Sequence, residues 1–296
     1  MGSYNYGNTD VAMATQNPSN KPGLGAMPVV LLLLVQLLAF WRAWQWYVNR
    51  IWESPEEALA LVVVLTVLCV CAIQRLRAQP GVRPPWGLLS IGFGLYTLLT
   101  LISAPMLLRT AAAVLTVGAT MYAVGFGGRK QVPRPRAALW GLLLLCMPLV
   151  PTLQFYLGYP ARLISAAITV VLLNANGYAV IQEGVFLRWN GELIQFDAPC
   201  SGITMLWAAW LICCVFALLQ GFNVLRTGLM LAGATLITLL GNSFRAASLF
   251  YLELDVAFAA QAWMHEAVGL IVFAGIITSL YSASIWLAQA FVSPAR

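Results

Sequence analysis

Long runs of apolar residues recur from residue 27 almost to the C-terminus, and they limit the folds open to this chain more than any other feature. A helix needs about 20 apolar residues to cross about 30 Å of hydrocarbon. Eight runs reach or approach that length, at residues 27–47, 57–74, 86–106, 109–127, 137–157, 200–220, 227–250 and 265–289. With 61% of its 296 residues hydrophobic and only 9% charged, the chain lies far from the composition of soluble domains. The sequence therefore predicts an all-α polytopic membrane protein with about eight transmembrane helices.

The basic residues between these runs predict the orientation of the chain in the membrane. The sixteen Lys and Arg residues contribute to a net charge of +6. They are scattered rather than gathered into a patch with interleaved aromatic residues, so no nucleic acid partner is expected. The loops around residues 75–83 and 129–136 are rich in arginine, and the positive-inside rule places both in the cytoplasm. Both termini are then cytoplasmic, and the segment 158–199 lies at the outer face.

Three parts are expected along the chain. Residues 1–25 are polar and are predicted to form a disordered cytoplasmic tail. Residues 26–135 hold the N-terminal transmembrane helices, and residues 136–296 form a C-terminal transmembrane region that carries the outer segment. In that segment the apolar stretch Leu163–Leu173 follows Arg162 and is too short to cross a bilayer, so an interfacial or re-entrant helix is predicted.

A turn signal marks the end of the outer segment. Two arms, Tyr178–Trp189 and Glu192–Phe196, flank the dipeptide Asn190-Gly191, which strongly favours a two-residue type I′ hairpin turn. A small extracytoplasmic β-hairpin near residues 176–199 is therefore expected to lead directly into Cys200.

Cys200 stands at the start of a predicted apolar helix. Unpaired N–H groups and the positive dipole end at a helix N-terminus lower the pKa of a thiol, which suits a nucleophile. The alternative is that Cys200 is a small apolar core residue, like the cysteines inside the other apolar runs. The six cysteines show no paired spacing, at positions 69, 71, 146, 200, 213 and 214. Neither a disulfide framework nor a metal site is therefore expected.

Arg245 lies inside an apolar run, where a charge is costly and usually faces a partner or a water-filled cavity. It follows Arg226 by 19 residues, or about 28 Å of helix, so the two arginines are expected at opposite interfaces. Asn242 precedes Arg245 by three residues and shares its helix face. The alternative reading of Arg245 is an interfacial arginine that extends to the lipid headgroups.

His265 is the only histidine of the chain and heads the last apolar run. It could serve as an interfacial residue beside Trp263. The predicted topology, however, brings Cys200, Arg245 and His265 from three helices to one depth at the outer face. A thiolate attacks a carbonyl, an imidazole transfers protons, and a guanidinium stabilises an oxyanion. Such chemistry requires no metal and no cofactor.

These residues resemble the motifs of the exosortase and archaeosortase family of membrane cysteine transpeptidases over roughly residues 140–290. The family pattern falls on Cys200-Ser201-Gly202, on Asn242 to Arg245, and on His265-Glu266 with Gly269. The resemblance implies catalytic roles for Cys200, Arg245 and His265. From their positions beside these three residues, Asn242, Asp197 and Ser201 are expected to orient side chains or to bind substrate.

The resemblance also implies a substrate and a location. The enzyme would be a cysteine protease or transpeptidase of the plasma membrane, with its active site on the periplasmic or extracellular side. It would cleave the C-terminal sorting tails of exported proteins, which carry a short motif, a transmembrane helix and a basic end, and pass them to an acceptor. Membrane lipid is the other expected partner. Two further readings stay open, a transporter that uses Arg245 and His265, and a non-catalytic scaffold for envelope assembly.

Overall fold

The computed structural model describes residues 26–53, 58, 60–67, 86–123, 136–195, 201–254 and 262–290, which are almost entirely helical with one small sheet. The N-terminal helices are α1 (Ala26–Ala39), α2 (Trp41–Glu53), α4 (Trp86–Leu101) and α5 (Met106–Ala123), and residues 60–67 are also helical. The C-terminal helices are α6 (Arg136–Leu145), α7 (Val150–Ala175), α8 (Ile203–Leu219), α9 (Val224–Leu254) and α10 (Ala262–Ala290). The predicted all-α membrane class is confirmed.

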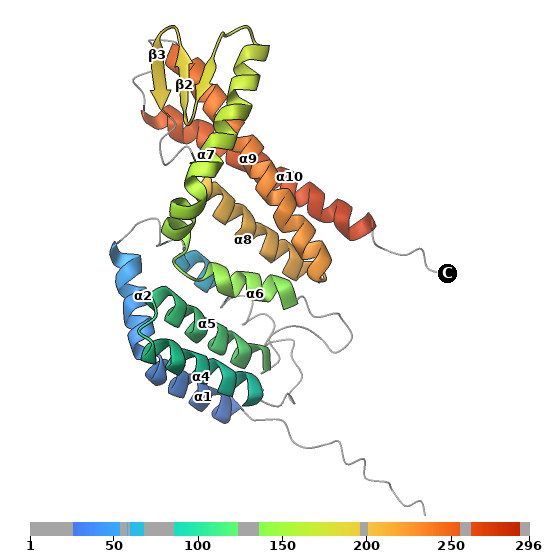
Figure 1. The fold of residues 1–296 in the computed structure, drawn as a ribbon. Helices are drawn as coiled ribbons and strands as arrows, with labels where there is room; N and C mark the ends of the chain where they lie inside the picture. Colours follow the sequence, from blue (N-terminus) through green and yellow to red (C-terminus); the bar gives the residue numbers. More distant parts are fainter. Residues whose placement is uncertain are drawn as a thin grey trace, which may run out of the picture.

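The helices pack largely in the order of the chain. Figure 1 shows α6 between α5 on one side and α8 on the other. Helix α9 contacts α7, α8 and α10, so it forms the centre of the C-terminal region. The largest apolar core connects the two regions through α6, with Leu142 of that helix fully buried and Trp207 of α8 beside it in the same cluster.

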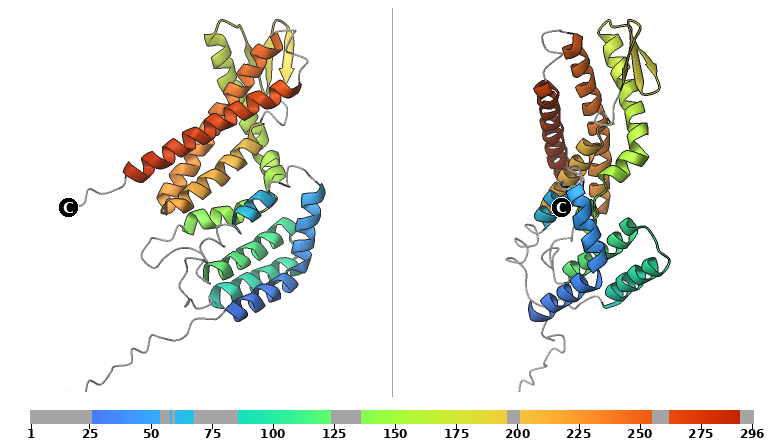
Figure 2. Two further views of the ribbon diagram at one scale, coloured as in Figure 1. Left: turned by 180° about the vertical axis from the view of Figure 1, so that it is seen from behind. Right: turned by 90° about the vertical axis from the view of Figure 1, so that its left-hand side faces the viewer.

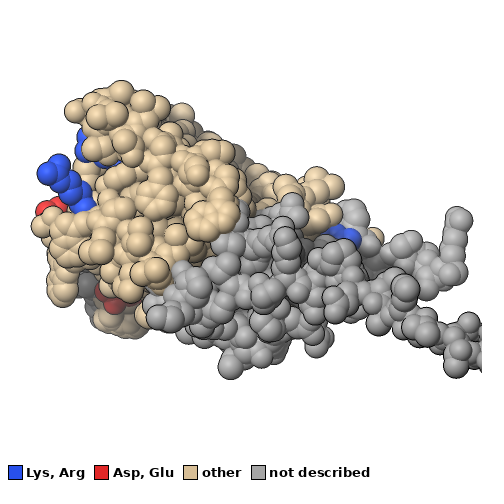
Figure 3. Space-filling view, turned by 90° about the horizontal axis from the view of Figure 1, so that it is seen from below, with Lys and Arg blue, Asp and Glu red and all other residues tan. Residues whose placement is uncertain are grey.

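The outer surface of the helices is apolar. Leu101, Phe155 and Ile271 are 77%, 79% and 71% exposed, an arrangement that water disfavours and lipid accepts. On the side drawn in Figure 3 the charged residues of the described surface gather mainly at one edge. Among the described residues three helices, α7, α9 and α10, are long and apolar enough to cross a membrane. A fourth is counted if α1 and α2 form one bent span, and the number eight stays a prediction.

The run 27–47, predicted as one span, is broken. Its helical parts Leu31–Ala39 and Trp41–Glu53 are bent by 73° at Phe40. The side chain of Phe40 is fully buried, and its ring lies 5.0 Å from the ring of Phe93 and 4.6 Å from that of Tyr96. The bend therefore directs this aromatic side chain into α4 instead of lipid.

The predictions of a span at 137–157 and of an interfacial helix at 163–173 are both wrong. Helix α6 ends at Leu145, and α7 then runs unbroken to Ala175. The stretch 163–173 is thus the second half of a 26-residue helix, about 39 Å long. Pro160 lies inside α7, because a membrane helix tolerates a proline whose freed carbonyl is satisfied by its surroundings. Pro160 and Arg162 therefore mark no helix end.

The predicted hairpin is present with its turn as expected. Strands β2 (Phe186–Trp189) and β3 (Glu192–Gln195) pair antiparallel. Asn190 and Gly191 have φ angles of 50° and 87°, as a type I′ turn requires. The arm predicted as one strand, Tyr178–Trp189, contains two: β1 (Ile181–Glu183) also pairs with β2. The chain reverses between them at Gly184, whose positive φ of 63° favours a two-residue turn.

The sheet rests on two helices that extend beyond the rest of the bundle. Helix α9 has 31 residues, or about 46 Å, against about 30 Å of hydrocarbon. Figure 2 shows its C-terminal part rising beside the end of α7 and the sheet. A separate core fills the space between them, with Leu173, Leu187 and Phe250 buried. This outer module holds α7 and α9 together above the start of α8.

Candidate functional site

Of the three predicted catalytic residues, the structure describes Arg245 and His265. Cys200 and Asp197 lie in the stretch 196–200, outside the described residues. Ser201 lies two residues before the start of α8, Arg245 lies within α9, and His265 lies in the first turn of α10. The described residues that adjoin Cys200 therefore define the site.

Arg245 connects the three helices. A Cβ atom added at Gly269 of α10 would lie 3.4 Å from Nε and 3.9 Å from Cζ of Arg245, and 3.8 Å from Cε of Met205 in α8. Gly269 follows His265 by four residues within α10, and Met205 is the third residue of α8. Residues four apart share a helix face, and helical side chains tilt toward the N-terminus. The Arg245 side chain therefore lies on the helix face of His265, and the first turn of α8 approaches the same point of α10.

Exposure differs among the site residues. His265 is exposed and Arg245 is partly buried. Ser201 and Asn242 are buried, at 3% and 2% exposure. An exposed imidazole can exchange protons with water, whereas a partly buried guanidinium acts on charge through a less polar medium, where its effect is stronger. The residues thus differ in the way that a proton carrier and an anion-stabilising group differ.

Ser201 is held by hydrogen bonds on both sides. Its hydroxyl donates to Oε1 of Gln154 in α7 over 2.8 Å. The same oxygen accepts a hydrogen bond from the backbone N–H of Ile203 over 3.3 Å. The first N–H groups of a helix lack partners within it, so Ser201 satisfies one of them. The residue that follows Cys200 is thereby fixed to both α7 and α8.

Gly202 and Asn242 meet at a close approach of α8 and α9. Gly202 has a φ of 70°, in the left-handed region. A Cβ atom added there would lie 2.9 Å from Cγ of Asn242, closer than side chains pack. Nδ2 of Asn242 donates to Oγ of Ser165 in α7 over 3.1 Å. The glycine after Cys200-Ser201 is therefore required both by backbone conformation and by space.

Polar residues of α7 complete this arrangement. The buried hydroxyl of Thr169 contacts two carbonyl oxygens, that of Ser165 in its own helix at 2.8 Å and that of Ser243 in α9 at 3.3 Å. The spacing of Gln154, Ser165 and Thr169 places them on one face of α7. Sequence reasoning missed all three, because it divided α7 into a span and an interfacial helix. Small and polar residues at every third or fourth position of one long apolar helix, Gln154, Gly158, Ala161, Ser165 and Thr169, were the signal that could have found them.

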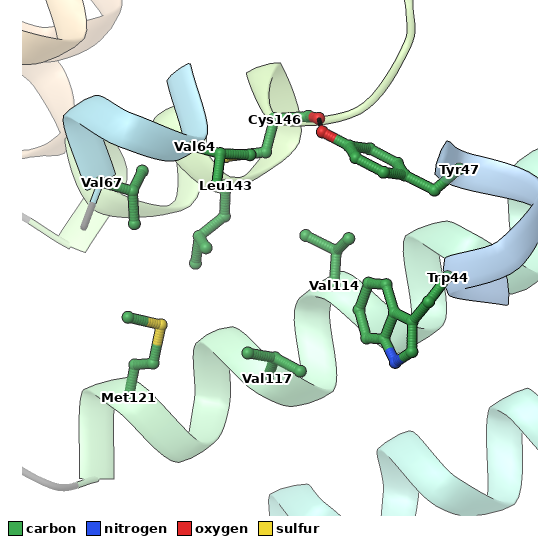
Figure 4. Close-up of a pocket in the computed structure, with 9 residues that line it drawn as sticks. All are labelled: Trp44, Tyr47, Val64, Val67, Val114, Val117, Met121, Leu143 and Cys146. Carbon is green, nitrogen blue, oxygen red and sulfur yellow. Dashed lines mark hydrogen bonds between the residues drawn. The ribbon is translucent and has the colours of Figure 1, made fainter. Parts of the chain in front are cut away.

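The structure also contains an apolar cavity, which lies in a different place. Figure 4 shows it enclosed by α2, the 60–67 helix, α5 and α6. Its volume is about 270 Å³. It is lined by Trp44, Tyr47, Val64, Val67, Val114, Val117, Met121, Leu143 and Cys146. At its edge the hydroxyl of Tyr47 donates to the carbonyl of Cys146 over 2.6 Å. The cavity shares no residue with the site around Arg245, and its lining suits apolar groups rather than peptide chemistry.

The chain matches a protein family. A family model described as transmembrane exosortase (Exosortase_EpsH) matches residues 51–282. Because that range covers most of the sequence, the chain belongs to the transmembrane exosortase family. The match begins well before residue 140, where the resemblance of the motifs began, and so includes most of the N-terminal helices. No curated protein and no solved structure matches the chain. The family is consistent with a sorting transpeptidase.

Proposed function

We propose that this exosortase cleaves the C-terminal sorting tails of exported proteins at the outer face of the plasma membrane and transfers them to an acceptor. Cys200 is the nucleophile, His265 is the acid and base, and Arg245 stabilises the oxyanion. Asn242, Ser201 and Asp197 orient the site or bind the substrate. The observation that carries this proposal is that the Arg245 side chain lies beside Gly269 of α10, four residues after His265, and that Met205 in the first turn of α8 approaches the same glycine.

The reaction follows from the chemistry of the three side chains. His265 accepts the proton of the Cys200 thiol, and the thiolate sulfur attacks the carbonyl carbon of the scissile amide. The negative charge that develops on the carbonyl oxygen is stabilised by Arg245. The C–N bond then breaks, and His265 returns the proton to the leaving amine. A thioester remains on Cys200, which an acceptor amine or water cleaves to release the thiol.

The length of α9 supports the proposed orientation. Arg226 lies near the start of this continuous helix, and Arg245 is about 28 Å further along it, which is close to the hydrocarbon thickness. Arg226 is then at the cytoplasmic interface and Arg245 at the outer one. The sheet, attached to the far end of α9, extends into the space where an exported substrate arrives. Its edge strands could pair with an extended sorting motif by strand addition.

The test is processing of a tagged exported protein that ends in a transmembrane helix and a basic tail. Cells express wild type, Cys200→Ala, Arg245→Ala or His265→Ala at matched membrane levels, and substrate length is read by immunoblot. The matched control is Cys213→Ala, which removes a buried thiol from α8. The proposal predicts shortened substrate with wild type and Cys213→Ala and full-length substrate with the other three variants. Shortening by Cys200→Ala would refute the assignment and favour a transporter or a scaffold.

A further inference from the structure

We propose that Gln154 of α7 is a positioning residue for the nucleophile: its side-chain oxygen, bound to the Ser201 hydroxyl, sets the first turn of α8 and with it Cys200. This inference rests on the proposed function, because it concerns how the same site is held. Gln154 lies 47 positions before Ser201 in the sequence, and it belongs to none of the three motifs that define the site. Its role is visible only from the contact between α7 and α8.

The hydrogen bonds of the Ser201 hydroxyl have defined directions. A hydroxyl group has one proton to donate and lone pairs to accept. The Ser201 proton is directed at Oε1 of Gln154 over 2.8 Å, which leaves a lone pair for the Ile203 N–H at 3.3 Å. Ser201 is 3% exposed, so water does not readily replace a lost partner. Removal of the Gln154 oxygen therefore leaves a buried donor unsatisfied and frees the hydroxyl to rotate.

The backbone of Gly158 leaves space for the Gln154 side chain. A Cβ atom added at Gly158 would lie 3.0 Å from Nε2 and 3.1 Å from Cδ of Gln154. The amide group thus lies along α7 over the bare backbone of Gly158, one turn further on. Glycine in a helix interior destabilises it by about 1 kcal/mol relative to alanine. Because Gly158 has no Cβ atom, the Gln154 amide fits at this buried position in the orientation that accepts the hydrogen bond from Ser201.

Ser201 stands between Cys200 and Gly202 in the chain. One peptide bond separates it from Cys200, and Gly202 on its other side is confined by its positive φ and by Asn242. Because Gly202 restricts Ser201 on one side, we expect loss of the Gln154 contact to act on Cys200, to which Ser201 is directly bonded. In reactions of this type, misplacement of a reacting group by about 1 Å lowers rates by about a hundredfold. The hydrogen bond to Gln154 thus acts on catalysis through Ser201.

The opposite end of α8 supplies a matched control. There Nε2 of Gln220 donates to Oγ of Ser284 in α10 over 2.9 Å. This contact is again a Gln–Ser hydrogen bond that joins α8 to a neighbouring helix, but it lies near the C-terminus of α8, away from the site. In this contact the glutamine donates instead of accepting, and a variant at Gln220 removes a Gln–Ser hydrogen bond far from the first turn of the helix.

The experiment measures substrate processing and, independently, the rate at which a maleimide alkylates Cys200 at one fixed pH, read on the Cys200 peptide by mass spectrometry. The variants are Gln154→Met, Gln154→Glu, Gly158→Ala, Ser201→Ala, the double variant Gln154→Met with Ser201→Ala, and Gln220→Met. Gly158→Ala favours the helix and displaces only the amide, so it tests the contact without threatening the fold.

The expected loss for Gln154→Met is about tenfold in processing rate, the size of one buried hydrogen bond, with a changed rate of Cys200 alkylation. Gln154→Glu keeps an acceptor oxygen and restores most of the rate, and Gly158→Ala behaves like Gln154→Met. The double variant is no worse than the poorer single variant, since both remove one contact. Gln220→Met matches wild type in both measurements.

Three results would overturn the inference. They are wild-type processing and alkylation in Gln154→Met, a loss in Gln154→Glu as large as in Gln154→Met, and additive losses in the double variant. Failure of the proposed function is recognised separately, by processing in Cys200→Ala. In that case the alkylation rate of Cys200, which requires no enzymatic activity, still tests the inference: a rate changed in Gln154→Met and unchanged in Gln220→Met supports it, and equal rates in both overturn it.

Discussion

The N-terminal helices and the C-terminal helices bury polar groups in different ways. In α5 the buried hydroxyls of Thr116 and Thr120 donate to carbonyls of their own helix. The side chain of Gln36 in α1 donates to the Thr120 hydroxyl and joins these two helices. In the C-terminal region Ser201 and Asn242 both bond to α7, and the Thr169 hydroxyl of α7 contacts the Ser243 carbonyl of α9 as well as the Ser165 carbonyl of its own helix.

The N-terminal region is therefore held mainly by apolar packing, whereas in the C-terminal region hydrogen bonds also fix the relative positions of side chains. Apolar contacts are non-directional and tolerate small shifts, whereas a hydrogen bond restricts both distance and angle. Two such bonds join α7 to Ser201, just before α8, and to Asn242 of α9. The N-terminal region instead leaves an apolar cavity of about 270 Å³. Substitutions should therefore affect activity in one region far more than in the other.

The largest effect is expected at Arg245. Arg245→Lys keeps the charge but loses the planar group with its several N–H donors, and loss of one oxyanion donor costs about a hundredfold or more in rate. The variant should accumulate in the membrane and leave substrate uncleaved in a quantitative immunoblot. Arg226→Lys on the same helix is the control and should process normally. Equal activity of the two variants would remove Arg245 from the chemistry.

An intermediate effect is expected at Gly202. In Gly202→Ala the positive φ costs about 1–2 kcal/mol, and the new methyl group displaces Asn242. The variant should unfold at a lower temperature in detergent and process more slowly than wild type. Gly233→Ala in α9, where an added Cβ meets nothing within 4 Å, is the control and should retain stability and activity. A fully active, stable Gly202→Ala protein would contradict the close approach of α8 and α9.

The smallest effect is expected in the apolar cavity. Val117→Leu adds one methylene group to a space that can hold it, so stability should change by less than about 1 kcal/mol. Processing should equal that of wild type, as measured by the same immunoblot. A large loss of processing here would break the comparison, because it would show that the N-terminal helices also hold the catalytic geometry.

The sequence predicted features whose causes are local. The membrane class follows from the apolar runs, and the turn at Asn190-Gly191 follows from two residues that accept positive φ. The continuity of α9 between Arg226 and Arg245 was likewise correctly assumed. Each of these features depends on a few adjacent residues or on one uninterrupted apolar pattern, which a single sequence displays.

Features that depend on tertiary contacts were not predictable in the same way. Phe40 bends the first apolar run because aromatic rings of α4 receive it, and nothing next to Phe40 indicates this. The short apolar stretch after Arg162 suggested a separate interfacial helix, yet α7 runs unbroken from Val150 to Ala175 and packs on α9. For the same reason Gln154 was overlooked, since its partner Ser201 is distant in sequence. The roles of Cys200, Arg245 and His265 stay predictions.

The central claim is that the substrate passes through a thioester on Cys200, and trapping with hydroxylamine tests it most directly. Membranes with wild type, Cys200→Ala or Cys213→Ala are incubated with a tagged substrate and hydroxylamine, and the new C-terminus is analysed by mass spectrometry. Hydroxylamine attacks a thioester carbonyl to give a hydroxamate and the free thiol. The account predicts a C-terminal hydroxamate with wild type and Cys213→Ala and none with Cys200→Ala. A hydroxamate formed by Cys200→Ala, or cleavage that yields only a carboxylate in wild type, would contradict it.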